Sequence, residues 1–477
     1  MSEGPGPRIG QDEWVARAGD NIDRPRLRQL VDRVPGWAQL LLFVIAVGLI
    51  PLVTDDGYIN AVVFDTLIFC LLAIGLNVVV GWGGLLDLGY IAFFGVGAYT
   101  YAILSSEQFD LHLSSVLVLV ICVVLGALLG LLVGLPSWRL VGDYLAIVTL
   151  FVYQIFISIV TNGNDLFGLD LTGGVNGIAN LDPFDLFGRE IVVAKQGIFN
   201  SNYVYIALGV FLVVFGALYL VNNSRIGRAW RALREDTLAA ELMGMPTDWL
   251  KLLAFAFGAA VAALTGGLFA SLKVGVFPET FSLTLLITVY AMLILGGVGS
   301  QTGAVLGAVV VYVFLEALRD PDVSGWVFYI AAIVALVLVV RPRWVVAAVL
   351  AATLVFGFAV HALAGAIDES WTTTAPADAD AVTRFLDAWV VIPATPGDSK
   401  TLAYIGLVAL ILLATTVKGI WRWAVLVPTL YLAAFVWENV MSQQPDVTRF
   451  VLLGALLVGV MVTRPSGILG ERRVEIV

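Results

Sequence analysis

The sequence predicts an all-α, polytopic membrane protein, and three observations lead to that class. Hydrophobic residues make up 60% of the 477 residues and charged residues only 13%, against roughly 25% charged residues in soluble proteins. Apolar runs of about 17–25 residues, long enough to cross a bilayer as a helix, recur along the chain. The runs lack the strict alternation of a barrel strand, and lipid offers the backbone no hydrogen-bond partners, so helices are expected.

We expect about fourteen transmembrane helices. They are placed at 37–53, 58–80, 84–105, 115–135, 143–161, 203–222, 249–272, 283–298, 301–318, 325–340, 344–365, 401–417, 423–438 and 449–463. Residues 1–36 are polar and rich in arginine, without an apolar run, and are therefore not a cleavable signal peptide. We interpret them as a cytoplasmic N-terminal tail.

The distribution of basic residues predicts the direction of the spans. With the N-terminus in the cytoplasm, most of the 26 lysines and arginines fall in inside segments, as the positive-inside rule requires. Both termini are then cytoplasmic, in a plasma or inner cell membrane. The long loops 162–202 and 366–400 lie outside, and the net charge of −10 is interpreted as a solvated outer surface.

A short basic segment, SRIGRAWRALREDTLAAELMGMP (224–246), separates the sixth and seventh spans. Its composition favours a helix over 226–244, and Gly244 followed by Pro246 is a stop signal. The helix is too short and too polar to cross the membrane. It is either a positively charged anchor or a helix that docks into a partner, for which the candidate residues are Arg228, Arg231, Arg234, Ala239, Ala240 and Gly244.

Glycines cluster in the third, eighth and ninth spans, in VVGWGGLLDLGY and LGGVGSQTGAVLGA. Glycines at such spacing let helices pack closely or let the backbone bend beside a translocation path. An intramembrane carboxylate, Asp87, is interpreted either as a helix cap or as a gating residue. The candidates for the path are Gly84, Asp87, Gly89, Gly95, Gly97, Gly296, Gly297, Gly299 and Gly303.

The outer loop contains LTGGVNGI, in which Gly173, Gly174 and Gly177 permit turns with positive φ and Asn176 tolerates them. It is either a plain turn or a contact site. No metal site is expected, because His112 and His361 are far apart and have no flanking ligand pattern.

The basic segment and the residues after it, RIGRAWRALREDTLAAELMGMPTDWLKLLAFAFGAAVAALTGGLFA, resemble the cytoplasmic loop of permease subunits of ATP-binding-cassette importers. Those loops carry Glu-Ala-Ala, three residues, then Gly. Here Ala239, Ala240 and Gly244 match, and Leu238 stands where Glu would. Further stretches, at 75–100, 140–150, 171–178 and 293–308, resemble branched-chain amino acid permeases of the LivM type, and 449–470 looks like their closing helix.

This resemblance implies a permease that imports branched-chain or other hydrophobic amino acids, although urea and short-amide permeases share much of the pattern. It implies two ATPase partner subunits that bind ATP and Mg²⁺, a second, LivH-like permease, and an extracytoplasmic binding protein facing the outer loop. No cofactor is expected in this chain. No nucleic-acid partner is expected.

Other classes fit less well. The chain has no Gly-x-x-x-x-Gly-Lys-Ser/Thr motif, so we do not expect it to hydrolyse ATP or to be an enzyme. A secondary transporter would show paired ionisable groups at mid-bilayer. Such groups are scarce in this sequence.

Residues 341–448 are not expected from the resemblance. We predict a core of about ten spans at 37–340 and about four extra spans. The extra spans comprise those in 341–448, which also contains the acidic loop, and a closing helix with a cytoplasmic C-terminus at 449–477. ALVLVVRPR (335–343) also looks like a closing helix, so the addition is alternatively a terminal extension. An amphipathic turn at 380–391 could lie on the membrane surface.

Overall fold

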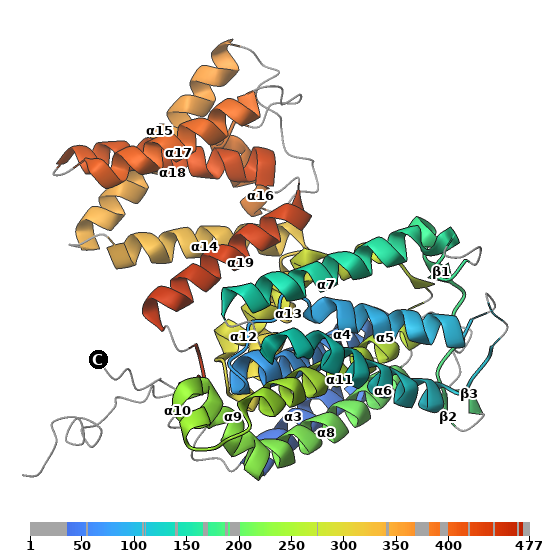
Figure 1. Cartoon of the computed structure of the whole chain (residues 1–477). Coiled ribbons are helices and arrows are strands. Elements are labelled where there is room, and N and C mark those ends of the chain that lie inside the picture. The colour runs from blue at the N-terminus through green and yellow to red at the C-terminus, as the bar shows by residue number, and fades with distance from the viewer. Residues whose placement is uncertain are drawn as a thin grey trace, which may run out of the picture. The chain divides into compact units, whose positions relative to one another are not determined.

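The computed structural model is helical nearly throughout the part of the chain that it describes (Figure 1). The chain forms two compact units, Met1–Tyr312 with Val460–Val477, and Val313–Gly459. The described residues are 36–53, 56–106, 109, 111–138, 142–165, 170–186, 189–190, 201–273, 275–339, 343–367, 381–391, 399–417, 420–441, 444–464 and 467–470.

The first unit is a helical bundle. Its longer elements are α3 (Gly36–Val53), α4 (Gly57–Leu76) with the π-helix η1 (Asn77–Trp82), α5 (Tyr90–Leu104), α6 (Ser115–Gly134), η2 (Leu135–Trp138), α7 (Asp143–Asn162), α8 (Ser201–Asn223), α9 (Arg225–Glu235), α10 (Thr237–Leu242), α11 (Thr247–Leu272) and α12 (Leu283–Gly296). Helix α13 (Gln301–Ala317) crosses the boundary between the units.

Helix α11 runs through the first unit with α5 and α6 packed against it (Figure 1). Glycines make this contact close. A Cβ atom at Gly97 of α5 would collide with the carbonyl of Ala263, and one at Gly130 of α6 would lie 2.6 Å from the carbonyl oxygen of Phe255. The helix backbones therefore touch directly, as in other membrane helix pairs with small residues at the crossing.

Short elements form the connections after α7 and after α11. These are the 3₁₀ turns η3 (Gly163–Asp165), η4 (Gly174–Asn176) and η5 (Pro278–Phe281), and four two-residue strands. Strand β1 (Ile178–Ala179) pairs antiparallel with β4 (Gly275–Val276), and β2 (Asp185–Leu186) pairs antiparallel with β3 (Arg189–Glu190). The β1–β4 pair attaches the loop after α7 to the segment after α11.

The second unit contains α14 (Pro321–Val339), α15 (Arg343–Ile367), α16 (Ala381–Trp389), α17 (Ser399–Thr416), α18 (Ile420–Val436), the π-helix η7 (Trp437–Met441) and most of α19 (Pro445–Thr463). The predicted amphipathic turn is α16, and its Trp389 is buried within the second unit. Its side chain is 7% exposed, packs edge-on against Tyr431, and donates from Nε1 to the carbonyl of Leu354 at 3.1 Å. Gly357 leaves the space that the indole occupies.

The all-α polytopic class is confirmed, and each of the fourteen predicted segments coincides largely with a helix. Among the described residues, six helices are long and apolar enough to cross a bilayer, and several predicted spans form shorter apolar helices. The count of fourteen and the direction of the spans stay predictions. The third predicted span, 84–105, begins only at Tyr90, because Gly84 adopts a left-handed φ of +68° that no continuous helix allows.

Candidate functional site

The predicted basic helix over 226–244 is in fact two helices, α9 and α10, which meet at Asp236. This residue is extended (φ −152°, ψ 107°), and its carboxylate accepts from the N–H of Ala239 at 3.0 Å. Asp236 therefore ends α9 and caps the N-terminus of α10. At the other end, the Ser224 hydroxyl accepts from the N–H of Ile226 at 3.1 Å and caps α9.

Helix α10 presents an apolar surface that the rest of the first unit does not cover. Leu238, Leu242 and Met243 are 72%, 89% and 81% exposed. Ala239 and Gly244 are also exposed, whereas Ala240 is buried against its own chain. Gly244 has a φ of +80°, and no atom lies within 4 Å of the position that its Cβ would take. Two of the three small residues predicted to receive a partner are therefore accessible, and Ala240 is not.

Trp230 anchors α9 on the helix bundle. The side chain is fully buried, and Nε1 donates to the carbonyl of Leu250 at 2.8 Å. The ring stacks on Trp82, with centroids 6.2 Å apart, and meets Phe257 edge-on. A buried indole that has a hydrogen-bond partner is a rigid attachment, so α9 is fixed to both η1 and α11.

The three predicted docking arginines differ in their surroundings. Arg228 and Arg231 are exposed and donate to Asn223 O and Asn222 Oδ1 beside them. Arg234 is half-buried and turns toward its own chain, where Nη1 donates to the carbonyl of Gly81 at 2.6 Å. The contact of Arg234 with a partner stays a prediction.

The side chain of Arg234 lies where two predicted path glycines leave room. A Cβ atom at Gly299 would collide with Nη1 of Arg234, and one at Gly84 would lie 3.1 Å from Cγ. We call the group formed by Asn77, Gly81, Gly84, Arg234 and Gly299 the arginine junction. It joins the end of η1, the end of α9 and the turn between α12 and α13.

The turn between α12 and α13 is held from η1. Gly297 and Gly299 adopt φ of +115° and +92°, which glycine alone adopts readily. The N–H of Gly299 donates to Oδ1 of Asn77 at 2.8 Å, and its carbonyl accepts from Nε1 of Trp82 at 3.0 Å.

The last described residues of the chain lie along the end of α12. The N–H groups of Ile468 and Leu469 donate to the carbonyls of Leu295 and Gly296, each at 2.9 Å. The final segment therefore satisfies carbonyls that the end of a helix leaves without partners.

Asp87 lies between η1 and α5 rather than inside a helix, and it is completely buried. Its Oδ1 accepts from the N–H of Gly89, the residue before α5, at 2.9 Å. Its carbonyl accepts from the hydroxyl of Tyr290 on α12 at 2.7 Å. Within the described residues, Oδ2 has no hydrogen-bond partner. The contact with Gly89 fits the interpretation as a cap, and the gating role stays a prediction.

The other predicted path glycines occupy close contacts inside the first unit. A Cβ at Gly89 would collide with the carbonyl of Thr149, and one at Gly95 with the ring of Phe156. Gly296 and Gly303 face each other across the turn from α12 to α13. Close packing is therefore sufficient to explain why these positions are glycines. The position of these glycines on a translocation path stays a prediction.

The loop after α7 makes the turns that its glycines predict. Gly173, Gly174 and Gly177 all have positive φ. The positive-φ asparagine is Asn180, at 57°, and not Asn176, which lies in η4. The turn packs against the segment after α11, because a Cβ at Gly177 would collide with the carbonyl of Val276.

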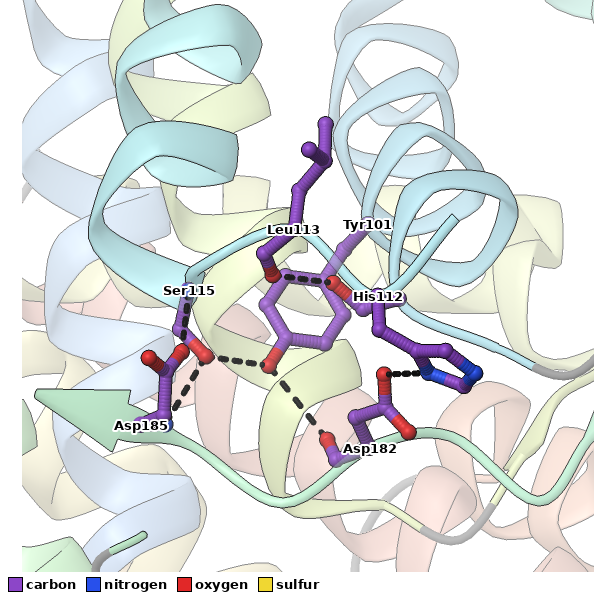
Figure 2. A network of polar contacts seen from close by, with 7 residues as sticks. Tyr101, His112, Leu113, Ser115, Asp182 and Asp185 are labelled. Atoms are coloured by element: carbon purple, nitrogen blue, oxygen red, sulfur yellow. Dashed lines mark hydrogen bonds and ion pairs between the residues drawn. The ribbon is translucent and has the colours of Figure 1, made fainter. Parts of the chain in front are cut away.

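A polar network attaches the same loop to α5 and α6 (Figure 2). The Ser115 hydroxyl lies 2.9 Å from that of Tyr101 and accepts from the N–H of Asp185 at 2.9 Å. Nδ1 of His112 lies 2.7 Å from a carboxylate oxygen of Asp182. Figure 2 shows Ser115 between Tyr101 and Asp185, so residues 182–185 are held against the start of α6.

Sequence reasoning overlooked an ion pair inside the bundle. Nζ of Lys273, at the end of α11, lies 3.2 Å from Oδ1 of Asp65 in α4, and the Tyr312 hydroxyl donates to Oδ2 at 3.3 Å. Lys273 also lies over the ring of Phe269. The available signal was an acidic residue within the predicted span 58–80, where carboxylates are costly and usually have a partner.

Comparison with known proteins identifies the family of the chain. The family described as "Branched-chain amino acid transport system / permease component" matches residues 58–320. That match spans α4 to α13 and includes the whole arginine junction. The chain belongs to this family.

Individual relatives agree with the family match. The high-affinity branched-chain amino acid transport system permease protein LivM of Escherichia coli K12 is 35% identical over 319 residues, which cover 63% of this chain and 72% of the relative. A probable LivM of Methanocaldococcus jannaschii is 29% identical, over 50% of this chain and 69% of the relative. The E. coli LivH permease is 25% identical, over 54% and 83%. No solved structure matches the chain.

Proposed function

We propose that the chain is the permease subunit of an ATP-binding-cassette importer that moves branched-chain or other hydrophobic amino acids into the cell. It would pair with a LivH-like permease and two ATPase subunits, and would receive its solute from an extracytoplasmic binding protein. ATP and Mg²⁺ would be bound by the ATPase subunits and not by this chain. Both termini would lie in the cytoplasm.

The observation that carries this proposal is the surface of α10. Leu238, Leu242 and Met243 expose large apolar side chains on a short helix between α8 and α11. The helix is too short to span a bilayer, and isolated exposed apolar clusters of this kind mark interaction sites. Arg228 and Arg231 of α9 are exposed and lie beside it, so a partner with an apolar groove and an acidic rim fits this surface.

The relatives support the solute and the second permease. Both LivM and LivH are named as parts of a branched-chain amino acid transport system, and this chain resembles each of them. The loop after α7, held in place by Ser115 and Asp185, would form part of the surface that receives the binding protein.

Reconstitution tests the proposal. The full chain would be purified with a LivH-like permease and ATPase subunits, placed in liposomes with ATP inside, and given a binding protein with labelled leucine. We expect uptake that needs ATP and the binding protein. Uptake of urea or a short amide in place of leucine would contradict the solute, and leucine uptake without ATPase subunits would contradict the class.

A further inference from the structure

Arg234 connects the proposed ATPase-docking surface to the turn between α12 and α13. Its backbone lies in the last turn of α9, two residues before Asp236 starts α10. Its guanidinium reaches Gly81 and Gly299, which are far from it in sequence. Arg234 therefore lies between the start of α10 and both of these segments.

The other contacts of α9 make this connection rigid. Trp230 lies one helical turn before Arg234 and is fixed by its hydrogen bond to Leu250 and by stacking on Trp82. Trp82 in turn donates to the carbonyl of Gly299. The end of α9 thus reaches the turn by two routes. One runs through the stacked indoles and the hydrogen bond of Trp82, and the other is the packing of the guanidinium against Gly299.

The chemistry of Arg234 suits a link between segments. Arginine stays charged and carries several donors in a fixed plane, so the guanidinium can bond the Gly81 carbonyl while it packs against Gly299. Gly81 and Gly299 carry no side chains that would restrict the position of the guanidinium. The turn can also change shape, because Gly297 and Gly299 already occupy backbone regions open mainly to glycine.

We infer that Arg234 is the positioning residue through which movement of the docked α9–α10 segment reaches the end of η1 and the turn between α12 and α13. The inference rests on the proposed function, because it assumes that α10 contacts an ATPase subunit. It differs from docking itself: the exposed face of α10 holds the ATPase, and the buried end of α9 transmits its movement.

The test measures how many ATP molecules are hydrolysed for each amino acid imported by the full reconstituted complex. This ratio does not change when fewer complexes fold, because hydrolysis and uptake fall together. In Arg234→Gln we expect the ATPase subunits to stay bound and the ratio to rise roughly tenfold or more, the factor expected from losing a charged hydrogen bond. Arg234→Lys keeps the charge and should recover part of the coupling.

Two further variants sharpen the test. Arg225→Gln changes an exposed arginine at the first position of α9 and should keep the wild-type ratio. Gly299→Ala keeps Arg234 but places a methyl group where its Nη1 lies and strains the φ of +92°, so it should raise the ratio as Arg234→Gln does.

An unchanged ratio in assembled Arg234→Gln would overturn the inference. Failure of both Arg234 variants to assemble, while Arg225→Gln assembles, would assign Arg234 a folding role and overturn it as well. A different result would contradict the proposed function, namely a wild-type complex that shows no ATP-dependent uptake or lacks ATPase subunits.

Discussion

Asp65 of α4 and Lys273 of α11 form an ion pair of 3.2 Å, although 208 residues separate them in the sequence. Both side chains are mostly buried, and Tyr312 donates to the same carboxylate. The pair connects α4, α11 and α13 within the first unit. Because charged groups are costly in a bilayer, each member of the pair stabilises the other.

We predict that neutralising one member of this pair destabilises the protein more than neutralising both. Asp65→Asn leaves Lys273 as an uncompensated cation and should cost about 1–3 kcal/mol of unfolding free energy. The double variant Asp65→Asn, Lys273→Met should recover part of that loss. Thermal unfolding in nanodiscs measures both effects. Additive losses in the double variant would show that the pair contributes no coupling energy.

A second prediction concerns the exposed apolar face of α10. Leu242→Glu should leave the fold intact, because the side chain is 89% exposed and such substitutions usually change stability by less than about 0.5 kcal/mol. The ATPase subunits should no longer co-purify with the variant, because the charge cannot be buried in an apolar groove. Retention of the ATPase at wild-type stoichiometry would place the docking surface elsewhere.

A third prediction concerns Gly244, whose φ of +80° suits glycine. Gly244→Val strains the end of α10 although the surrounding space is empty. We expect normal membrane insertion and weakened ATPase binding. Gly209→Val serves as the control, because Gly209 lies inside α8 with equally open space and without positive φ. Equal loss of ATPase binding in both variants would point to a general folding defect.

A fourth prediction concerns Trp230. Trp230→Ala removes a fully buried side chain with its hydrogen bond to Leu250 and should destabilise the protein by about 3–5 kcal/mol. Trp230→Phe keeps most of the volume and should lose less. The melting temperatures of the two variants, measured beside wild type in detergent, check the order. A melting temperature of Trp230→Ala equal to wild type would mean that α9 is not anchored by this residue.

A fifth prediction concerns the second unit, which we expect to be peripheral to transport. Deleting 399–436 removes α17 and α18 but keeps Glu438 and Trp437, which contact Tyr329 and Phe328 of α14. Two predicted spans, 401–417 and 423–438, are lost, so the chain still returns to the same side. Uptake at normal expression is the expected result. Loss of uptake by a complex that inserts and assembles normally would assign the added helices a role in transport.

The helices could be predicted from sequence because crossing a bilayer demands length and apolarity, and both are visible in a local window. The break at Asp236 was missed by the prediction of one helix over 226–244, although an aspartate directly before Thr237 and Leu238 is an N-cap signal. The role of Arg234 could not be predicted from the sequence. Arginines at every third position suggest one exposed face, and only the fold places Arg234 against Gly81 and Gly299.

The contacts of the turn between α12 and α13 lay equally beyond sequence reasoning. Asn77 and Gly299, which share a hydrogen bond, are 222 residues apart. The spacing of glycines predicts that helices or turns approach closely, but it does not say which ones. That information lies in tertiary packing, and a single sequence carries no trace of it.

The bonds from Ile468 and Leu469 to the end of α12 have a consequence for biosynthesis. The first unit comprises residues up to Tyr312 and again from Val460, so its last piece leaves the ribosome after the whole second unit. Before residues 468 and 469 are synthesised, the carbonyls of Leu295 and Gly296 lack these two donors. The nascent chain therefore inserts α15 to α18 while the turn beside Arg234 is still unfinished, and only a full-length product can complete it.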